Sequence, residues 1–350
     1  MKTNDARGLF MTLAASCLCW AAATPALADT VSPIAGVAAP EDLELMPDGR
    51  TMLISNYWSD QGRKPGGLAW MDLTKEQPQW LSLRVAKQKG WGDPVCTAPP
   101  AHIGPHGIHL SRRGDGRLQL LVVNHAERES IEFVEIVPGH GNVPLTGIWR
   151  GCMISPDQEF NDVAATPEGG FIASVPVEKA VKDEHRGSKL LDGRDTGYLA
   201  EWTPGKGLGR IAGTEAPFDN GVQLSPDGRT IYYNAWTARE VRSFDRRTGK
   251  AGKRVTLGFM PDNLSWRADG RLIAAGIDEL TPAARCPQVD GACAYAFGVA
   301  AIDPAEMTAT PLYRGAQGIM PGTSVAVQTG DTLYIGGFVG NRLVKIRLDH

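Results

Sequence analysis

A short motif recurs six times between residues 43 and 336, and this repetition limits more than any other feature what the chain can fold into. Each copy has an alternating apolar run, a turn containing glycine, and a second run rich in β-branched or aromatic residues. Pro-Asp-Gly and Ala-Asp-Gly turns provide the positive φ that tight hairpins need. The copies begin at Leu43, Ile108, Val163, Val222, Leu264 and Val325.

A weaker pair of strands follows each hairpin, for example in segments 67–73, 241–245 and 343–348. Four strands in each of six units predict an all-β chain folded as a six-bladed β-propeller. The chain has 350 residues, which is more than one hydrophobic core usually accommodates, and a radial array avoids that problem. Two β-sandwiches are the alternative architecture.

Polar residues stand directly before the first strand of every copy. First strands line the central channel of a propeller, so these side chains should converge at one end of the axis. Carboxylates gathered in a low dielectric repel each other unless a cation is present, and oxygen ligands without cysteine favour Ca²⁺. Any one of these residues could instead be an ordinary turn residue. They are Glu41-Asp42, His106, Asn161-Asp162, Asp219-Asn220, Asp262-Asn263 and Thr323-Ser324.

The first 28 residues have the three parts of a secretory signal peptide. Lys2 and Arg7 are basic, segment 9–23 carries no charge, and a small-x-small cleavage signal ends at Ala28. We therefore expect export to the periplasm or outside the cell, with residues 29–350 forming one propeller domain. A retained anchor is the alternative, but the apolar run is shorter than the roughly 20 residues that span a membrane.

Four cysteines remain after the expected cleavage, and an even count in an exported chain suggests disulfides. Cys286 and Cys293 flank a short turn-rich segment, so they are the easier pair to join, which leaves Cys96 to pair with Cys152. Four unpaired thiols are the alternative. The chain has no Cys-x-x-Cys motif, which argues against a cysteine zinc site.

Over residues 40–348 the sequence resembles the paraoxonase/arylesterase family, within the wider group of six-bladed gluconolactonase- and regucalcin-like calcium-dependent hydrolases. The order and spacing of several short motifs carry the resemblance. They are 41–49 (EDLELMPDG), 105–109 (PHGIH), 120–125 (LLVVNH), 160–163 (FNDV), 220–228 (NGVQLSPDG), 262–265 (DNLS) and 322–325 (GTSV).

The resemblance implies two calcium ions in the central tunnel. It assigns a catalytic ion to five side chains, which are Glu41, Asn161, Asn220, Asp262 and Asn263. It assigns a deeper structural ion to Asp42, Asp162 and the backbone carbonyl of Ile108. The family's histidine pair corresponds to His106 and His125.

The implied chemistry is hydrolysis of a lactone or aryl ester, a small-molecule substrate. Calcium would polarise the carbonyl and stabilise the oxyanion. His106 would take a proton from water, and His125 would orient the ring of His106. The spacing of His102, His106 and His109 also permits a zinc site, although the start of a strand rarely provides the geometry. We expect His109 to be packed or at the rim, and His140, His185 and His350 to lie in loops or at the terminus.

The sequence also departs from the family. The cysteine bridge that joins the two chain ends in the family has no counterpart, so closure must depend on strand pairing, with segment 31–37 beside the last strand. Segment 178–197 is strongly charged; it is either an exposed loop or a lid over the tunnel, and a polar lid would favour a polar substrate. Asn56, Tyr57, Trp58 and Trp91 are further candidates for the rim.

Composition excludes some functions and leaves others open. The net charge is −3 and no basic block occurs, which argues against a nucleic-acid partner. A sugar lactonase with one divalent ion and a non-enzymatic, metal-stabilised binding propeller remain alternatives. A strictosidine-synthase-like enzyme is disfavoured because its chemistry needs no calcium cluster. The physiological substrate and the oligomeric state are not predicted.

Overall fold

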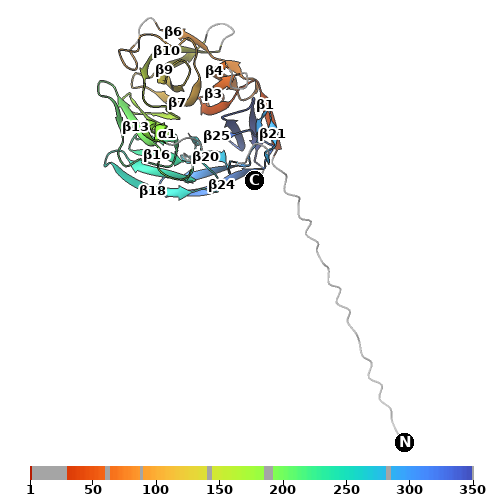
Figure 1. Cartoon of the computed structure of the whole chain (residues 1–350). Coiled ribbons are helices and arrows are strands. Elements are labelled where there is room, and N and C mark those ends of the chain that lie inside the picture. Colours follow the sequence, from red (N-terminus) through yellow and green to blue (C-terminus); the bar gives the residue numbers. More distant parts are fainter. Residues whose placement is uncertain are drawn as a thin grey trace.

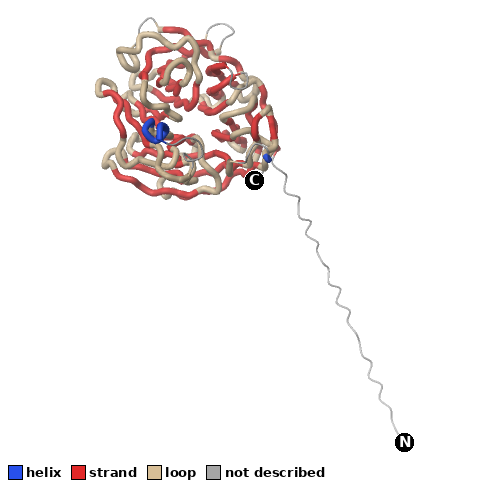
Figure 2. The backbone as a smooth tube through the Cα atoms, viewed as in Figure 1, coloured by secondary structure: helices blue, strands red, loops and turns tan. Residues whose placement is uncertain are grey.

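Six β-sheets form a ring in the computed structural model, which describes Met1 and residues 30–59, 64–86, 90–139, 144–184, 192–280 and 285–348 (Figure 1). Figure 2 shows that strands make up nearly all of the regular structure. The six-bladed propeller predicted from the repeats is therefore confirmed. Residues 2–29, which include the expected signal peptide, Cys17 and Cys19, lie outside the described residues.

Each blade follows the predicted order of antiparallel strands, with the first strand innermost. The first blade contains β2 (Pro40–Leu45), β3 (Thr51–Ser59), β4 (Lys64–Asp72) and β5 (Gln79–Trp80). The second contains β7 (Pro105–Arg112), β8 (Leu118–Asn124), β9 (Ser130–Pro138), β10 (Leu145–Ile154) and a fifth, outer strand, β6 (Ser82–Val85), parallel to β10. The third contains β11 (Val163–Ala165), β12 (Phe171–Val175), β13 (Tyr198–Thr203) and β14 (Gly207–Arg210).

The remaining three blades complete the ring. The fourth contains β15 (Asp219–Leu224), β16 (Thr230–Ala235), β17 (Glu240–Asp245) and β18 (Lys250–Thr256). The fifth contains β19 (Leu264–Trp266), β20 (Leu272–Ile277), β23 (Phe297–Asp303) and β24 (Thr308–Gly315). The sixth contains β25 (Thr323–Thr329), β26 (Thr332–Gly337), β27 (Arg342–Arg347) and β1 (Thr30–Ala35). A small hairpin is formed by β21 (Gln288–Val289) and β22 (Ala292–Cys293).

The ring closes by strand pairing, as predicted. β1, from the start of the described chain, pairs antiparallel with β27, and this pairing matches Val31 with Ile346 and Ile34 with Leu343. In Figure 1 β1 lies beside the blue strands of the last blade. Hydrogen bonds from both ends of the chain therefore hold one sheet together, so the ring cannot open without breaking that sheet.

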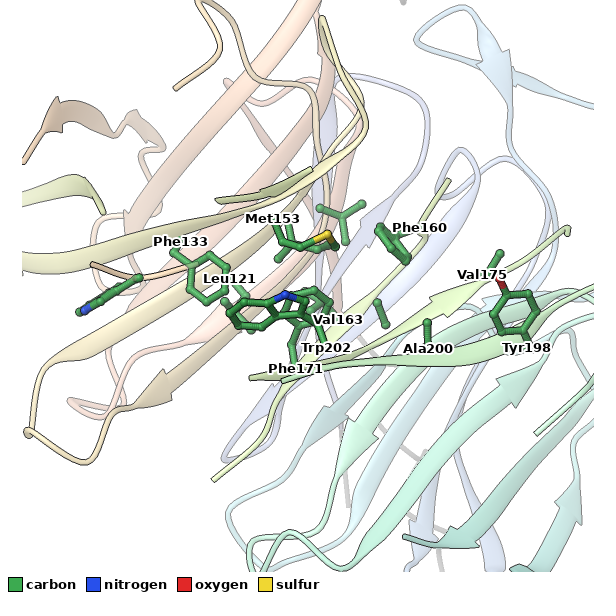
Figure 3. Close-up of a cluster of buried hydrophobic side chains, with 14 residues drawn as sticks. Leu121, Phe133, Met153, Phe160, Val163, Phe171, Val175, Tyr198, Ala200 and Trp202 are labelled. Atoms are coloured by element: carbon green, nitrogen blue, oxygen red, sulfur yellow. The ribbon is translucent and has the colours of Figure 1, made fainter. Parts of the chain in front are cut away.

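Six hydrophobic clusters fill the spaces between consecutive blades. The continuous apolar run of β8 shows why: Leu120 and Val122 pack toward the first blade, whereas Leu121 and Val123 pack toward the third. Successive side chains of a strand point to opposite faces, so a strand between two neighbours is apolar at every position. Figure 3 shows the cluster between the second and third blades, where the ring of Phe171 stacks on that of Trp202 at 5.5 Å between centroids.

The hairpin turns between first and second strands have the conformation that their sequences predict. Gly49 and Gly228, each after Pro-Asp, have φ values of 65° and 72°. Only glycine adopts this region without strain from a Cβ atom. Because the turns lie at one end of the blades, the starts of all the inner strands lie at the other end.

Two disulfides are present, and they join the predicted pairs. Cys96 bonds to Cys152 and Cys286 bonds to Cys293, with Cα–Cα distances of 5.6 and 5.5 Å. The short helix α1 (Lys179–Glu184) belongs to the charged segment 178–197, of which residues 185–191 are not described. In the part of the chain that the structure describes, no helix is both long enough and apolar enough to cross a membrane.

We expect Ile34→Ala to destabilise the protein by roughly 2–5 kcal/mol, because Ile34 is buried where β1 closes the ring and its loss leaves a cavity. Val31→Ala on the same strand is the control, since Val31 is 39 % exposed; it should change stability by less than about 0.5 kcal/mol. Urea unfolding measures both. Equal effects of the two variants would contradict closure by a buried strand.

Candidate metal centre

β-Bulges place polar side chains at the start of the inner strands. The pairing register of the first strand shifts between Pro40 and Leu43, between Pro105 and Ile108, between Asp219 and Val222, and between Thr323 and Val325. A bulge inserts residues that have no partner across the ladder and redirects their side chains. The predicted polar residues occupy these inserted positions in four blades. In the third and fifth blades they come directly before β11 and β19.

All eight predicted ligand residues are buried, from Glu41 and Asn263 at 1 % exposure to Asn161 at 7 %. Burying a polar or charged group is costly unless it is hydrogen-bonded, paired or bound to a metal. Their partners therefore decide what the arrangement can do.

Asp42 and Asp162 each join two blades through backbone N–H groups. Asp42 accepts a hydrogen bond from its own neighbour Leu43 and one from Ile108 of the next blade, both at 2.8 Å. Asp162 repeats the pattern two blades later, accepting from Val163 and Val222 at 2.7 Å. Asp42 therefore ties the first blade to the second, and Asp162 ties the third to the fourth. The structure shows Ile108 as a donor to Asp42, in addition to the carbonyl role that the family resemblance implies.

Glycines let neighbouring inner strands come close at this level. A Cβ atom added to Gly107 would lie 2.4 Å from Asp162 Oδ1, and one on Gly221 would lie 2.4 Å from the carbonyl oxygen of Asp262. The two glycine N–H groups donate to the carbonyl oxygens of Asn161 and Asp262, at 3.0 and 2.7 Å. Any larger residue at either glycine would push the polar residues apart.

The asparagines use their amide N–H groups to hold the carboxylates in place. Asn263 Nδ2 donates to Glu41 Oε1 at 2.7 Å and to the Glu41 carbonyl oxygen at 3.2 Å. The Asn220 side chain hydrogen-bonds to Asp262. Ser324 Oγ also donates to the Glu41 carbonyl oxygen, at 2.5 Å. The first, fourth, fifth and sixth blades are thus linked at this end of the channel.

Four buried oxygens in this group have no hydrogen-bond partner: Glu41 Oε2, Asn161 Oδ1, Asn220 Oδ1 and Asn263 Oδ1. All four belong to the set that the family resemblance assigns to the catalytic ion. Buried oxygens without donors are costly, and a hard cation is the partner that such oxygens prefer. The residues therefore fit calcium. No three His, Cys, Asp or Glu side chains in the described ranges come close enough to hold an ion by themselves, so the asparagine oxygens are essential to this set.

The electrostatics of the group also favour a cation. Burial, followed by the charges of Asp42, Asp262 and Asp162, raises the pKa of Glu41 well above its ordinary value. Burial raises the pKa of Asp42 to about 7 and that of Asp262 to about 8. Burial and then the charge of Asp42 raise the pKa of Asp162 as well. A divalent ion would offset both the lost hydration and the mutual repulsion.

The predicted histidine pair lies beside this group. His106 Nδ1 is 3.0 Å from His125 Nε2, and His106 Nε2 is 3.6 Å from Glu41 Oε1. Burial, and then the proximity of His125, lowers the pKa of His106 well below its usual value, so the ring is neutral near pH 7. The ring of Tyr57 stacks on that of His106, with centroids 4.5 Å apart. Tyr57, predicted for the rim, thus covers the histidine.

The structure separates the other candidates from this site. His102 contacts the exposed Glu127 at 2.8 Å, and His109 lies 3.4 Å from Glu44, so these two and His106 have three different partners. Burial lowers the pKa of His109 to about 4. His140, His185, His350 and the side chain of Trp58 lie outside the described residues. Asn56 is fully buried and donates no hydrogen bond through Nδ2.

The prediction that Trp91 lies at the rim is wrong. It is 6 % exposed and belongs to the cluster between the second and third blades. The Arg113 guanidinium lies 4.3 Å from its ring centroid. Packing between the blades, which sequence alone does not locate, explains its position.

Sequence reasoning missed Glu129, whose Oε2 lies 2.7 Å from His125 Nδ1. Outside a helix, a glutamate four residues after a histidine does not predict that the two side chains are in contact. Only the loop that follows β8 brings the two side chains together.

A cavity of about 700 Å³ lies at the opposite end of the inner strands, among Arg112, Arg113, Glu168 and Trp266. The helix α1 is at the end that holds the buried oxygens, because Lys179 and Lys182 pair with Asp157 and Glu159 in the segment before Asn161. Residues 178–184, the described start of the charged segment, therefore lie at the end of the blades that holds the candidate site.

Comparison with known proteins agrees with this fold. Residues 120–282 match the family described as the SMP-30/Gluconolactonase/LRE-like region. The chain is 26 % identical over 241 residues to serum paraoxonase/arylesterase 2 of Rattus norvegicus and 24 % identical over 235 residues to serum paraoxonase/arylesterase 1 of Homo sapiens. Each match covers 64 % of this chain and 62 % of the relative, so the chain spans less than two thirds of their length.

Solved structures of two proteins share the fold. A luciferin-regenerating enzyme has a TM-score of 0.54 at 13 % identity, covering 91 % of this chain and 95 % of the other. A candidate gluconolactonase has a TM-score of 0.52 at 15 % identity, covering 92 % of each chain. The predicted family resemblance is confirmed: the chain is similar to paraoxonase/arylesterase proteins over 64 % of its length, and residues 120–282 are similar to the gluconolactonase-like family.

We expect the calcium-stripped protein to lose stability as pH rises from about 5 to about 8. The folded pKa values of Asp42 and Asp262 lie above the unfolded value of about 3.9. The folded state therefore binds more protons than the unfolded state in this range, and stability falls with pH. Calcium binds the deprotonated ligands, so its stabilising effect should grow with pH.

Urea unfolding at several pH values, with and without calcium, measures these effects. Asp262→Asn should reduce the slope of stability against pH in the stripped protein. A stability that depends on neither pH nor calcium would contradict a cation at this site.

Proposed function

We propose that the protein is an exported, calcium-dependent hydrolase of lactones and aryl esters. Two observations carry the proposal together: four buried oxygens have no hydrogen-bond partner, and the His106 ring lies 3.6 Å from the carboxylate of Glu41, which holds one of these oxygens. The relatives named as paraoxonase/arylesterases support the reaction class. The two disulfides support export, and the expected signal peptide at 1–28 remains a prediction.

The catalytic ion would be held by the carboxylates of Glu41 and Asp262 and by the amide oxygens of Asn161, Asn220 and Asn263. A second, structural ion would be held by Asp42, Asp162 and the carbonyl of Ile108. When bound, calcium supplies Lewis-acid polarisation of a carbonyl and stabilisation of the negative charge that develops on its oxygen.

The residues of this chain supply the rest of the chemistry. His106 is neutral, and its Nε2 is directed at Glu41 Oε1, so Nε2 is the position for taking a proton from a water molecule. His125 contacts the opposite nitrogen and orients the ring. Tyr57 stacks on one face of His106 and limits its movement. The product would be a hydroxy acid from a lactone, or an acid and a phenol from an aryl ester.

A sugar lactonase with one divalent ion is the second candidate. The match of residues 120–282 to the gluconolactonase-like family favours it. The paired histidines, with their 3.0 Å contact, favour the first candidate, because a site with no water-activating base leaves such a pair without a role. A propeller in which the metal only ties the blades together is the third possibility.

The deciding experiment is hydrolysis of an aryl ester and of aliphatic, acyl-homoserine and sugar lactones, with calcium and after chelation. We expect calcium-dependent turnover of at least one ester or lactone, because the polarising charge leaves with the ion. Turnover of the sugar lactone alone, with one ion per chain, would favour the second candidate. No turnover by a folded, calcium-loaded protein would contradict the hydrolase and favour the binding propeller.

We expect Asp262→Asn to lower kcat by roughly 100-fold or more, since it removes a charged ligand from the group that faces the reacting carbonyl. The control is Asp269→Asn, a half-exposed residue of the turn at the far end of the same blade. Steady-state kinetics and urea unfolding should show lost turnover for the first variant and wild-type turnover for the second. Undiminished turnover by Asp262→Asn would remove Asp262 from the site.

A further inference from the structure

Glu129 is placed against the histidine pair by a clamped loop. The loop connects β8 to β9 and runs from His125 to Glu129. Asn124, at the end of β8, is fully buried, and its Nδ2 donates to the carbonyl oxygens of Ala126 and Arg128 at 3.0 and 2.9 Å. The chain therefore doubles back after His125. This turn brings Glu129 Oε2 to 2.7 Å from His125 Nδ1.

The Glu129 carboxylate contacts His125. The neighbouring charged groups have other partners: Arg128 pairs with Glu132 at 2.9 Å, and Glu127 pairs with His102 at 2.8 Å. In the described ranges the only ion pair of Glu129 is with His125. The loop thus carries three charged residues in succession, and only Glu129 faces the site.

Hydrogen-bond chemistry then determines the protonation of both rings. A carboxylate only accepts hydrogen bonds, so the proton of a neutral His125 must be on Nδ1, facing Glu129. His125 Nε2 is then an acceptor, and the contact at 3.0 Å requires His106 to donate from Nδ1. His106 Nε2 is left with a free lone pair, and this is the atom that faces Glu41.

We propose that Glu129 is a positioning residue that fixes the tautomers of His125 and His106, so that His106 presents an unprotonated Nε2 to the reacting water. This proposal rests on the proposed hydrolase function. Without Glu129, His125 can carry its proton on Nε2, and His106 must then turn its lone pair toward His125. The nitrogen next to the ligand group would be protonated and could no longer accept a proton.

The loop offers a matched control for the test. Glu127 is two residues away, and its Oε1 also contacts a histidine nitrogen, His102 Nδ1. That pair is exposed, and the Glu127 carboxylate also accepts the backbone N–H groups of Ala101 and His102, neither of which is a predicted site residue. Glu127→Gln therefore makes the same chemical change in the same loop without altering the His106–His125 pair.

The experiment compares Glu129→Gln with Glu127→Gln in the full-length protein loaded with calcium. We expect Glu129→Gln to lower kcat by roughly 10–100-fold, the usual effect of losing a partner that orients a functional histidine. KM, calcium affinity and the urea midpoint should stay within about twofold of wild type, because the side-chain contact of Glu129 in the described ranges is with His125 and not with a predicted calcium ligand. Glu127→Gln should match wild type throughout.

A spectroscopic readout separates positioning from a general structural effect. Nitrogen NMR of labelled histidines should show the Nδ1-protonated form of His125 in the wild type and a mixture of tautomers in Glu129→Gln. Unchanged histidine spectra, or a wild-type kcat, in Glu129→Gln would overturn the proposal. If the wild type hydrolyses none of the substrates, the hydrolase proposal fails, whereas the spectra still decide whether Glu129 sets the tautomers.

Discussion

The burial of carboxylates and amide oxygens at one end of the channel is the constraint on which the rest of the structure depends. Six blades bring their inner strands to a common axis, and the polar residues at the strand starts are largely shielded from bulk water. Asp42 and Asp162 compensate in part by accepting backbone hydrogen bonds from neighbouring blades. The oxygens of Glu41, Asn161, Asn220 and Asn263 do not find donors. Closing the ring thus gathers the buried oxygens that we propose as cation ligands.

Function follows from how the strand starts are built. The bulges insert polar residues where the ladder would otherwise continue, and Gly107 and Gly221 let the neighbouring polar segments come into contact. The same inner strand that holds Ile108 against Asp42 also positions His106 next to Glu41. The proposed ligands and the proposed base therefore stand at the starts of paired inner strands, and their relative positions are set by the sheet. Pre-organisation of this kind is what stabilisation of a developing oxyanion requires.

Most of the fold could be predicted from local patterns. The glycine turns, the apolar runs and the polar residues at the strand starts each reflect a short-range rule, and the structure has the predicted order of four strands in all six blades. The disulfide pairs and the closure of the ring by β1 were also predicted from the sequence. Trp91 was predicted at the rim but lies between two blades, because aromatic residues have the same local pattern in either place.

The sequence by itself determined the repeat, the residue types at each strand start and the choice of hard oxygen ligands, because alternation and turn chemistry depend on neighbours along the chain. Only the tertiary structure decided that Asn263 donates to Glu41 across 222 residues of sequence, and that Asn124 folds the loop so that Glu129 reaches His125. Those contacts depend on how blades close around the axis and on how one buried amide clamps a turn. Neither leaves a periodic signal in the sequence.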